Sequence, residues 1–177
     1  MRVYLVEKPD WFTGQMEIPK FYQSVNIQDF LEDRMYGLPQ RLFMEITHKE
    51  FAEYPGLLLE PIPLFEENLW KTILQCMPKP LDTQFIFMEE NTRRSISYHC
   101  PAFQRIKGSV RINGRRGERQ AVHLLLEKKL PKDVPAFYLQ EEGRVRVLLQ
   151  LDLVESFMRV GLNDVRLLPV VKEEVKF

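Results

Sequence analysis

Prolines mark several of the boundaries between predicted elements in this sequence. The 177 residues include 12 prolines, and a proline inside a helix removes a backbone donor and clashes with the preceding turn. Pro39 bars the extension of any helix before it, and Pro61 closes a short apolar strand over 57–59. Pro78 and Pro80 end an apolar stripe with helical spacing. These prolines therefore set the ends of the predicted elements that precede them.

Helical spacing of apolar residues predicts three helices. They span residues 27–35, 63–77 and 152–160. Asn26 can cap the first helix, and Pro63 suits the start of the second because its missing N–H is not needed there. Asp152 and Glu155 form a capping-box-like pair in the third helix. Phe157 lies on the apolar face of that helix, so we expect it to be buried.

Most of the remaining sequence has the alternation or the β-branched and aromatic content of strands. The expected strands cover residues 2–7, 41–47, 57–59, 85–88, 96–100, 109–112, 121–127, 136–140, 145–149 and 165–170. Asn113-Gly114 predicts a type I′ turn, and Glu142-Gly143 predicts a second hairpin. Pro169 marks the last strand as an edge strand.

The order of these elements predicts the class of fold. Strands and helices do not alternate regularly, as they would in βαβ units. We therefore expect a single α+β domain over residues 1–177, with a mixed or mostly antiparallel β-sheet and about three helices. The prolines near 78–80 mark the place where a seam between two units would fall.

The composition favours a cytoplasmic protein with a hydrophobic core. Hydrophobic residues make up 45% of the chain and charged residues 28%, which are globular values. There are only two cysteines and the first residues have no apolar signal core, so we expect a reduced, cytoplasmic setting. No apolar run approaches the roughly 20 residues that cross a bilayer, so no membrane contact is expected.

The histidines and cysteines do not form a recognisable catalytic or metal site. His99 and Cys100 are neighbours on a predicted strand, so their side chains point to opposite faces, and no second Cys/His pair with ligand spacing is present. His123 lies on an apolar strand, where a core histidine is the expected role. Glycine-rich loops for phosphates or dinucleotides are also missing. We therefore expect no catalytic residues, no metal and no cofactor.

One pattern leaves an enzymatic alternative open, a divalent-metal nuclease. Asp82 and the triplet Glu127-Lys128-Lys129 resemble the metal-binding core of restriction-type nucleases. There, carboxylates hold magnesium and a lysine stabilises charge on phosphate. That fold places its two motifs on neighbouring strands of one hairpin, whereas about forty residues separate them here.

Basic residues concentrate in one part of the chain and leave a second alternative open, nucleic-acid binding. Residues 1–90 carry 8 basic and 15 acidic residues, whereas residues 91–177 carry 17 and 10. The stretch 93–132 holds 11 basic residues against Glu118 and Glu127, which would suit phosphate contacts. The candidate patch consists of Arg105, Lys107, Arg111, Arg115, Arg116 and Arg119. A long, solvated hairpin would have the same composition, and aromatic residues for base stacking are few.

Two stretches of the sequence are similar to a family of bacterial proteins. The first is FYQSVNIQDFLEDRMYGLPQRLFMEI, residues 21–46, and the second is HLLLEKKLPKDVPAFYLQEEGRVRVLLQLDLVESFMRVGLNDVRLLPV, residues 123–170. In element order they resemble the immunity proteins that are encoded beside polymorphic or contact-dependent toxins. The resemblance implies a protein that neutralises its cognate toxin by direct protein–protein binding. It implies no catalytic residues, because these families share none.

Acidic residues in the first half are the predicted toxin-binding site. Many such toxins act on nucleic acids through basic clefts, which an inhibitor can cover with carboxylates. Glu66 and Glu67 are expected in the first turn of the predicted helix 63–77, and Glu89 and Glu90 follow the predicted strand 85–88. Ordinary solvated charges would have the same pattern. The sequence leaves the oligomeric state open.

Overall fold

The strands form two sheets, one closed into a barrel and one open. The computed structural model describes residues 2–9, 16–48, 54–114 and 120–175. The barrel consists of β1 (Val3–Glu7), β8 (Arg105–Asn113), β9 (Ala121–Leu126), β10 (Ala136–Glu141), β11 (Arg144–Gln150) and β12 (Arg166–Val175). Its strands follow the order β1-β11-β10-β8-β9-β12 around the closed barrel. Two neighbouring pairs, β8 with β10 and β9 with β12, are parallel, and the others are antiparallel.

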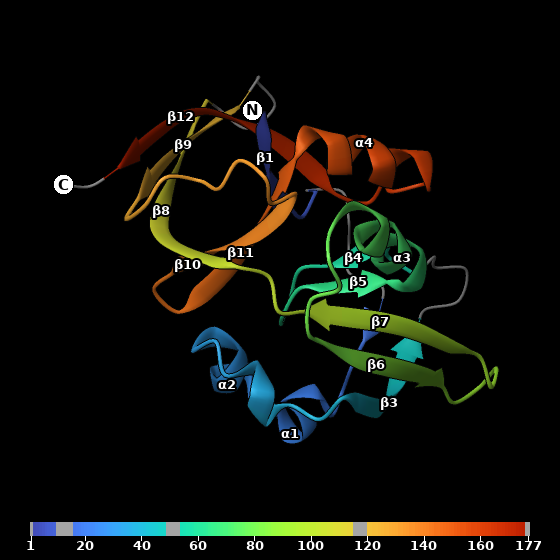
Figure 1. The fold of residues 1–177 in the computed structure, drawn as a ribbon. Coiled ribbons are helices and arrows are strands. Elements are labelled where there is room, and N and C mark those ends of the chain that lie inside the picture. The colour runs from blue at the N-terminus through green and yellow to red at the C-terminus, as the bar shows by residue number, and fades with distance from the viewer. Residues whose placement is uncertain (1, 10–15, 49–53, 115–119, 176–177) are drawn as a thin grey trace.

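The open sheet comes from the part of the chain between β1 and β8. It contains β2 (Met16–Glu17), β3 (Arg41–His48), β4 (Leu57–Leu58), β5 (Leu64–Glu66), β6 (Asp82–Glu89) and β7 (Ser95–Pro101). The strand order is β2-β3-β6-β7-β5-β4, and only β3 and β6 run parallel. In Figure 1 the barrel occupies the upper left and the open sheet lies below it at the right. The fold is therefore α+β with mixed sheets, as predicted.

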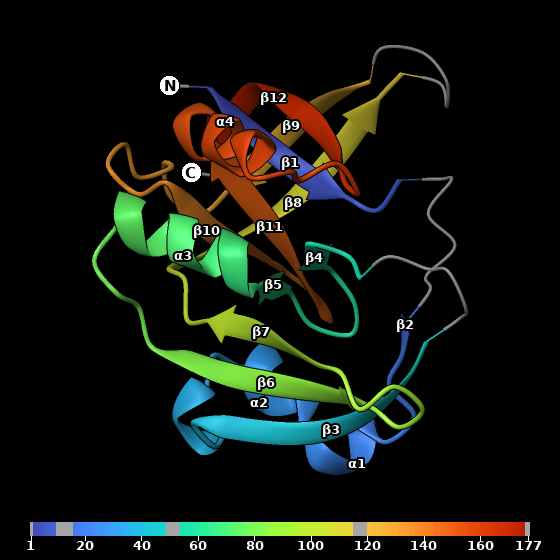
Figure 2. The same ribbon diagram turned by 90° about the vertical axis from the view of Figure 1, so that its right-hand side faces the viewer.

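Four helices cover the open sheet and its junction with the barrel. Within the described part of the chain they are α1 (Phe21–Ser24), α2 (Ile27–Leu31), α3 (Glu67–Cys76) and α4 (Leu151–Arg159), and a 3₁₀ turn spans Met35–Gly37. Helices α1 and α2 lie on one side of the open sheet, whereas α3 and α4 pack together beside the barrel (Figures 1 and 2). Only three helices were expected, because α1 is too short to show a helical period.

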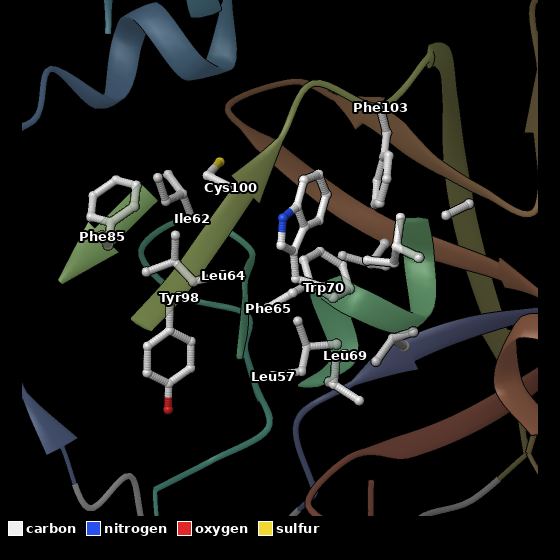
Figure 3. Close-up of a cluster of buried hydrophobic side chains, with 14 of the residues drawn as sticks. Leu57, Ile62, Leu64, Phe65, Leu69, Trp70, Phe85, Tyr98, Cys100 and Phe103 are labelled. Atoms are coloured by element: carbon white, nitrogen blue, oxygen red, sulfur yellow. The ribbon is translucent and has the colours of Figure 1, made fainter. Parts of the chain in front are cut away.

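The buried side chains form two clusters that differ in composition. The barrel interior holds mainly aliphatic residues, including Leu5, Leu124 and Leu148, around Phe137. The larger cluster lies between the barrel, the open sheet and the helices, and it is rich in aromatic rings. Figure 3 shows part of this larger cluster, which we call the shared core. Strands β10 and β11 contribute to both clusters, so their inward and outward faces are both apolar.

The second predicted helix begins later than expected. Residues 64–66 form β5, in which Phe65 lies opposite His99 of β7 and Leu64 opposite Leu58 of β4. Strand pairing on both sides therefore outweighs the suitability of Pro63 for a helix start. The helix starts at Glu67, and Glu66 is its N-cap, with a carboxylate oxygen that accepts a hydrogen bond from the backbone N–H of Asn68 at 2.8 Å.

Two other predicted helix boundaries also differ from the structure. Helix α2 has the predicted Asn26 cap, which accepts a hydrogen bond from Gln28 N, but it ends at Leu31 rather than at residue 35. Helix α4 begins at Leu151, so the predicted capping box at Asp152 is wrong. The N-cap residue is Gln150, whose side chain instead donates to backbone carbonyls of residues 132 and 134. Phe157 is fully buried, as predicted.

The two predicted hairpins have different outcomes. Glu141 pairs with Arg144 across Glu142-Gly143, and Gly143 has a φ of 71°, so this two-residue turn is confirmed. Asn113 pairs with Ala121 inside the β8–β9 ladder, so Asn113-Gly114 does not form a two-residue turn. The longer connection includes residues 115–119, which lie outside the described residues.

The last strand does not form the expected sheet edge. Residues 166–169 of β12 pair with β1, and residues 170–175 pair with β9. Pro169 thus lies where β12 changes partner, beside an irregularity in the register between Val170 and Lys172. Its missing N–H is tolerated at this transition, and the strand continues to Val175 to close the barrel.

Candidate functional site

A cleft lies where the barrel meets the first two helices and the loop before β5. Its volume is about 450 Å³. The lining residues come from four separate segments of the chain: 6–8, 22–31, 59–63 and 143–147. The first and last segments belong to β1 and to the β10–β11 hairpin, and the second contains α1 and α2. The cleft is therefore a product of the tertiary fold, with no counterpart in any one stretch of sequence.

A network of ion pairs forms the barrel side of this cleft. Arg146 contacts Glu7 and also donates from Nε to Glu141 Oε2 at 2.5 Å. All three side chains are at most 21% exposed. Arg144 Nε lies 3.2 Å from the same oxygen of Glu141, and Glu141 Oε1 accepts from Val110 N at 2.9 Å. The network therefore balances two guanidinium groups with two carboxylates and holds them in place.

The opposite side and the rim of the cleft are more apolar. Ile27 and Leu31 are half-buried, and Tyr22 is 75% exposed on α1 beside them. Lys8 and Glu60 add exposed charges of opposite sign. None of the described residues that line the cleft is a histidine, cysteine, serine or threonine. Apolar walls, fixed charges and an exposed aromatic ring are features of surfaces that recognise a partner.

Arg105 joins the barrel to α2 near this cleft. Its guanidinium carbon Cζ lies 4.6 Å from the centre of the Phe30 ring and 5.5 Å from that of Tyr138, distances that allow cation–π attraction. One terminal nitrogen donates to Gln140 Oε1 at 2.6 Å, and the other donates to Phe30 O. The side chain is only 8% exposed. Arg105 is therefore a structural residue that fixes α2, and thus one wall of the cleft, against β10.

A second polar cluster centres on His99 of β7. Its Nδ1 lies 2.7 Å from Asp82 Oδ2, and its Nε2 lies 2.8 Å from Glu67 Oε2. The ring stacks on Trp70 at 5.0 Å with an interplanar angle of 12°. Only the imidazolium form can donate to both carboxylates. His99 thus ties the start of α3 to β6 and β7, and both of its ring nitrogens are occupied.

The contact with His99 lowers the pKa of the Glu67 carboxyl group. Partial burial acts to raise its pKa, but the hydrogen bond and charge of His99, and then Lys71, hold the pKa below its ordinary value. Cys100, next to His99, points to the opposite face of β7, and burial raises the pKa of its thiol well above the usual range. His99 and Cys100 therefore face different surroundings, as the alternation of a strand predicts.

The four acidic residues predicted to bind a toxin do not form one patch. Glu66 caps α3, and Glu67 contacts His99. Glu89 accepts a hydrogen bond from Tyr54 Oη at 3.2 Å and also contacts Thr92, and Glu90 is exposed. Glu66 lies opposite Tyr98 of β7, which in turn lies opposite Phe85 of β6. Glu89 is four residues further along β6 than Phe85, a distance of about 13 Å along the strand. Their role in toxin binding remains a prediction.

The residues of the two alternative functions are also dispersed. Lys107 and Arg111 are exposed on β8, whereas the side chain of Arg105 is only 8% exposed. Arg115, Arg116 and Arg119 lie outside the described residues. Asp82 belongs to the open sheet, whereas Glu127 and Lys129 follow β9 of the barrel. His123, expected in the core, is half-buried opposite Arg111. The structure does not bring Asp82 together with Glu127 and Lys129.

Comparison with known proteins provides no family assignment. No protein-family model matches the chain, and no curated protein matches it. Within the described residues, no helix has the length and apolar character needed to cross a membrane. The same residues contain no cluster of three or more His, Cys, Asp or Glu side chains placed to hold a metal ion.

Sequence reasoning did not identify the cleft or the His99 cluster. Both depend on contacts between residues far apart in the chain, such as Glu7 with Arg146 and Glu67 with His99. A local signal existed only for the wall formed by residues 143–147, because Glu142-Gly143 predicts the tip of that hairpin.

Proposed function

We propose that this chain is a cytoplasmic immunity-type protein that neutralises a bacterial toxin by direct binding, and that the toxin docks at the cleft. The main support for this proposal is that two walls of the cleft come from the two stretches of sequence that resemble immunity proteins. Residues 22–31 belong to the first stretch that resembles immunity proteins, and residues 143–147 belong to the second. Two stretches that are far apart in the sequence thus contribute to one concave surface.

The chemistry of the cleft suits a protein partner. An exposed aromatic side chain beside a half-buried apolar wall is the usual composition of an interface centre. Tyr22 is 75% exposed, while Phe21 next to it is buried and stacks on Phe85 at 5.9 Å. The tyrosine is therefore held on a fixed backbone and can contact a partner at low entropic cost. Lys8, Glu60 and Arg144 would orient the partner by charge.

Binding to the toxin encoded beside this chain tests the proposal. We expect Tyr22→Ala to raise the Kd at least about tenfold, the effect of removing a central aromatic residue at an interface. Isothermal titration calorimetry provides the Kd, and circular dichroism checks that the variant is folded. The matched control is Met158→Ala on α4, a 59% exposed apolar residue outside the cleft, which should leave the Kd within about twofold.

Other outcomes would contradict the proposal in distinguishable ways. A wild-type protein that does not bind the toxin would reject the immunity function. Retained binding by Tyr22→Ala, with loss on reversing Glu66, Glu67, Glu89 and Glu90 to Lys, would move the docking site to these acidic residues. Magnesium-dependent cleavage of DNA or RNA that Glu127→Ala abolishes would instead support the nuclease alternative.

A further inference from the structure

Among the described residues, strand β3 has a strand partner on only one side along most of its length. Residues 41–46 pair with β6 on one side. On the other side, β2 pairs only with Thr47 and His48. Among the described residues, no other strand continues this edge of the sheet. Figure 2 shows β3 at the lower boundary of the open sheet, with α1 and α2 on the side away from the viewer.

The register with β6 identifies which backbone groups point to the open edge. In a parallel pair, alternate residues of a strand bond to the neighbour, and the residues between them point away. Gln84 N donates to Gln40 O at 2.9 Å, and Gln84 lies opposite Arg41. Gln40, Leu42 and Met44 therefore bond to β6, whereas the N–H and C=O groups of Arg41, Phe43 and Glu45 point outward.

The side chains of these three residues lie on the exposed face of the same edge. Phe43 is 60% exposed and the side chain of Glu45 is 65% exposed, and Arg41 is also exposed. Exposed strand edges are usually blocked by proline, by inward-pointing charges or by very short strands. Over 41–46 there is no proline, but charged side chains also protect edges, and Arg41 and Glu45 are exposed there. These two charges have opposite signs, so a second copy of the strand could pair them rather than be repelled. An apolar ring at the centre of an open, regular edge instead favours pairing with another strand.

We infer that β3 pairs antiparallel with β3 of a second copy of this chain, with the two-fold axis at Phe43. In this register Phe43 lies opposite Phe43 of the other copy, and Arg41 lies opposite its Glu45. The outward N–H and C=O groups of all three residues then exchange hydrogen bonds with the opposite strand. A two-fold axis repeats each contact, so the arrangement forms a closed dimer.

Charge selects this register over its neighbours. Centring the pair on Arg41 or on Glu45 would place like charges opposite each other, which is destabilising in a strand pair. Centring it on Leu42 or Met44 would place a charged side chain opposite Phe43. Only the Phe43-centred register pairs opposite charges at both ends. Both charged residues already have a partner within the chain. Lys20 Nζ lies 3.6 Å from Glu45 Oε2, and Arg41 Nε donates to Gln84 Oε1 at 2.8 Å. The Lys20 and Glu45 side chains are mostly exposed, and the guanidinium of Arg41 has further N–H groups, so each charge can also bind a second partner.

Charge-reversal variants test the dimer without any toxin. Sedimentation equilibrium of the wild-type chain, over a range of concentrations, should show a reversible shift from the 21.1 kDa of one chain to about twice that mass. Arg41→Glu alone and Glu45→Arg alone should each weaken the dimer at least about tenfold, because each places like charges opposite each other. The double variant, with both substitutions, should restore the wild-type dissociation constant to within about threefold.

Mixing the two single variants tests whether Arg41 of one copy lies opposite Glu45 of the other. The Arg41→Glu and Glu45→Arg variants should form a mixed dimer with each other, because their edges are then complementary. Met158→Lys on α4 is the matched control and should dimerise as wild type does. A wild-type chain that stays monomeric, a double variant that does not recover, or a dimer that Met158→Lys disrupts would overturn the inference. Thermal unfolding checks that each variant is folded.

The dimer inference is independent of the proposed function. No residue of β3 lines the cleft, and mass measurements on the chain alone need no toxin. A failed toxin-binding assay would therefore leave the dimer unaffected, and a monomeric chain would leave the toxin-binding proposal unaffected.

Discussion

The barrel and the open sheet differ in how their side chains fill space. The barrel interior is small and mainly aliphatic, and Gly108 of β8 supplies the room that its neighbours need. The shared core on the other side of β10 and β11 is built from large rings such as Phe65, Phe87 and Tyr98. The barrel should therefore be sensitive to added atoms, whereas the shared core should be sensitive to removed ones.

Removing a ring from the shared core should have the largest effect on stability. Phe157 of α4 is fully buried, and its ring centre lies 6.1 Å from that of Phe65 on β5. It therefore links a helix attached to the barrel with the open sheet. We expect Phe157→Ala to lower the free energy of unfolding by about 3–5 kcal/mol, measured by urea denaturation.

Its neighbour provides the matched control for this prediction. Met158 is 59% exposed, so Met158→Ala should change stability by no more than about 0.5 kcal/mol. If Phe157→Ala cost only a few tenths of a kcal/mol but abolished toxin binding, Phe157 would be an interface residue and the shared core would not depend on it.

Adding one methyl group to the barrel interior tests the other half of the comparison. A Cβ at position 108 would lie 2.7 Å from Leu125 O and 2.8 Å from Leu126 Cδ2. Because the first contact is with backbone, Gly108→Ala must shift the β8–β9 ladder, at a cost of about 1–3 kcal/mol. Urea denaturation should show this loss, whereas Ser109→Ala on the exposed face of the same strand should be nearly neutral. A neutral Gly108→Ala would show that the barrel is not tightly filled.

The contact between α3 and the open sheet should make a smaller, pH-dependent contribution. The pKa of Glu67 is lower in the folded protein than its ordinary value of about 4.3. A lowered pKa stabilises the fold above the unfolded pKa, and this stabilisation is lost as the pH falls through the folded pKa. The difference in unfolding free energy between wild type and Glu67→Gln should therefore shrink as the pH falls from about 6 to about 3.

Solvent limits the size of this effect. The Glu67 side chain is 35% exposed, so screening reduces its contribution. Glu155→Gln on α4 controls for the loss of a helix carboxylate, since Glu155 only approaches Arg159 at 3.9 Å. A Glu67→Gln difference that stays constant from pH 6 to pH 3 would contradict a role for the His99 contact.

Local sequence patterns predicted the class of fold and much of its detail. The burial of Phe157, the Asn26 cap and the Glu142-Gly143 hairpin all depend on residues within a few positions of each other. The failures involve distant partners. Leu64–Glu66 forms a strand because β4 and β7 lie beside it, and Pro169 is accommodated because β12 changes partner there. No local pattern contains that information.

The candidate site was less accessible to sequence reasoning for the same reason. The acidic residues were grouped because they are near each other in the chain. In the structure Glu66 caps α3 and Glu67 contacts His99, whereas Glu89 contacts Tyr54. The cleft could not be predicted, because Glu7 and Arg146 become neighbours only when β1 pairs with β11.

The pairing of β1 with β12 has a consequence for synthesis of the chain. Leu5 lies opposite Leu168, so the first barrel strand leaves the ribosome long before its partner exists. The open sheet has all its strands once β7 is made, but the shared core also contains residues that are made later, among them Tyr138, Val147 and Phe157. A nascent chain of intermediate length therefore exposes a large aromatic surface, which is the kind of surface that chaperones bind. Closure of the barrel is a late step of biogenesis.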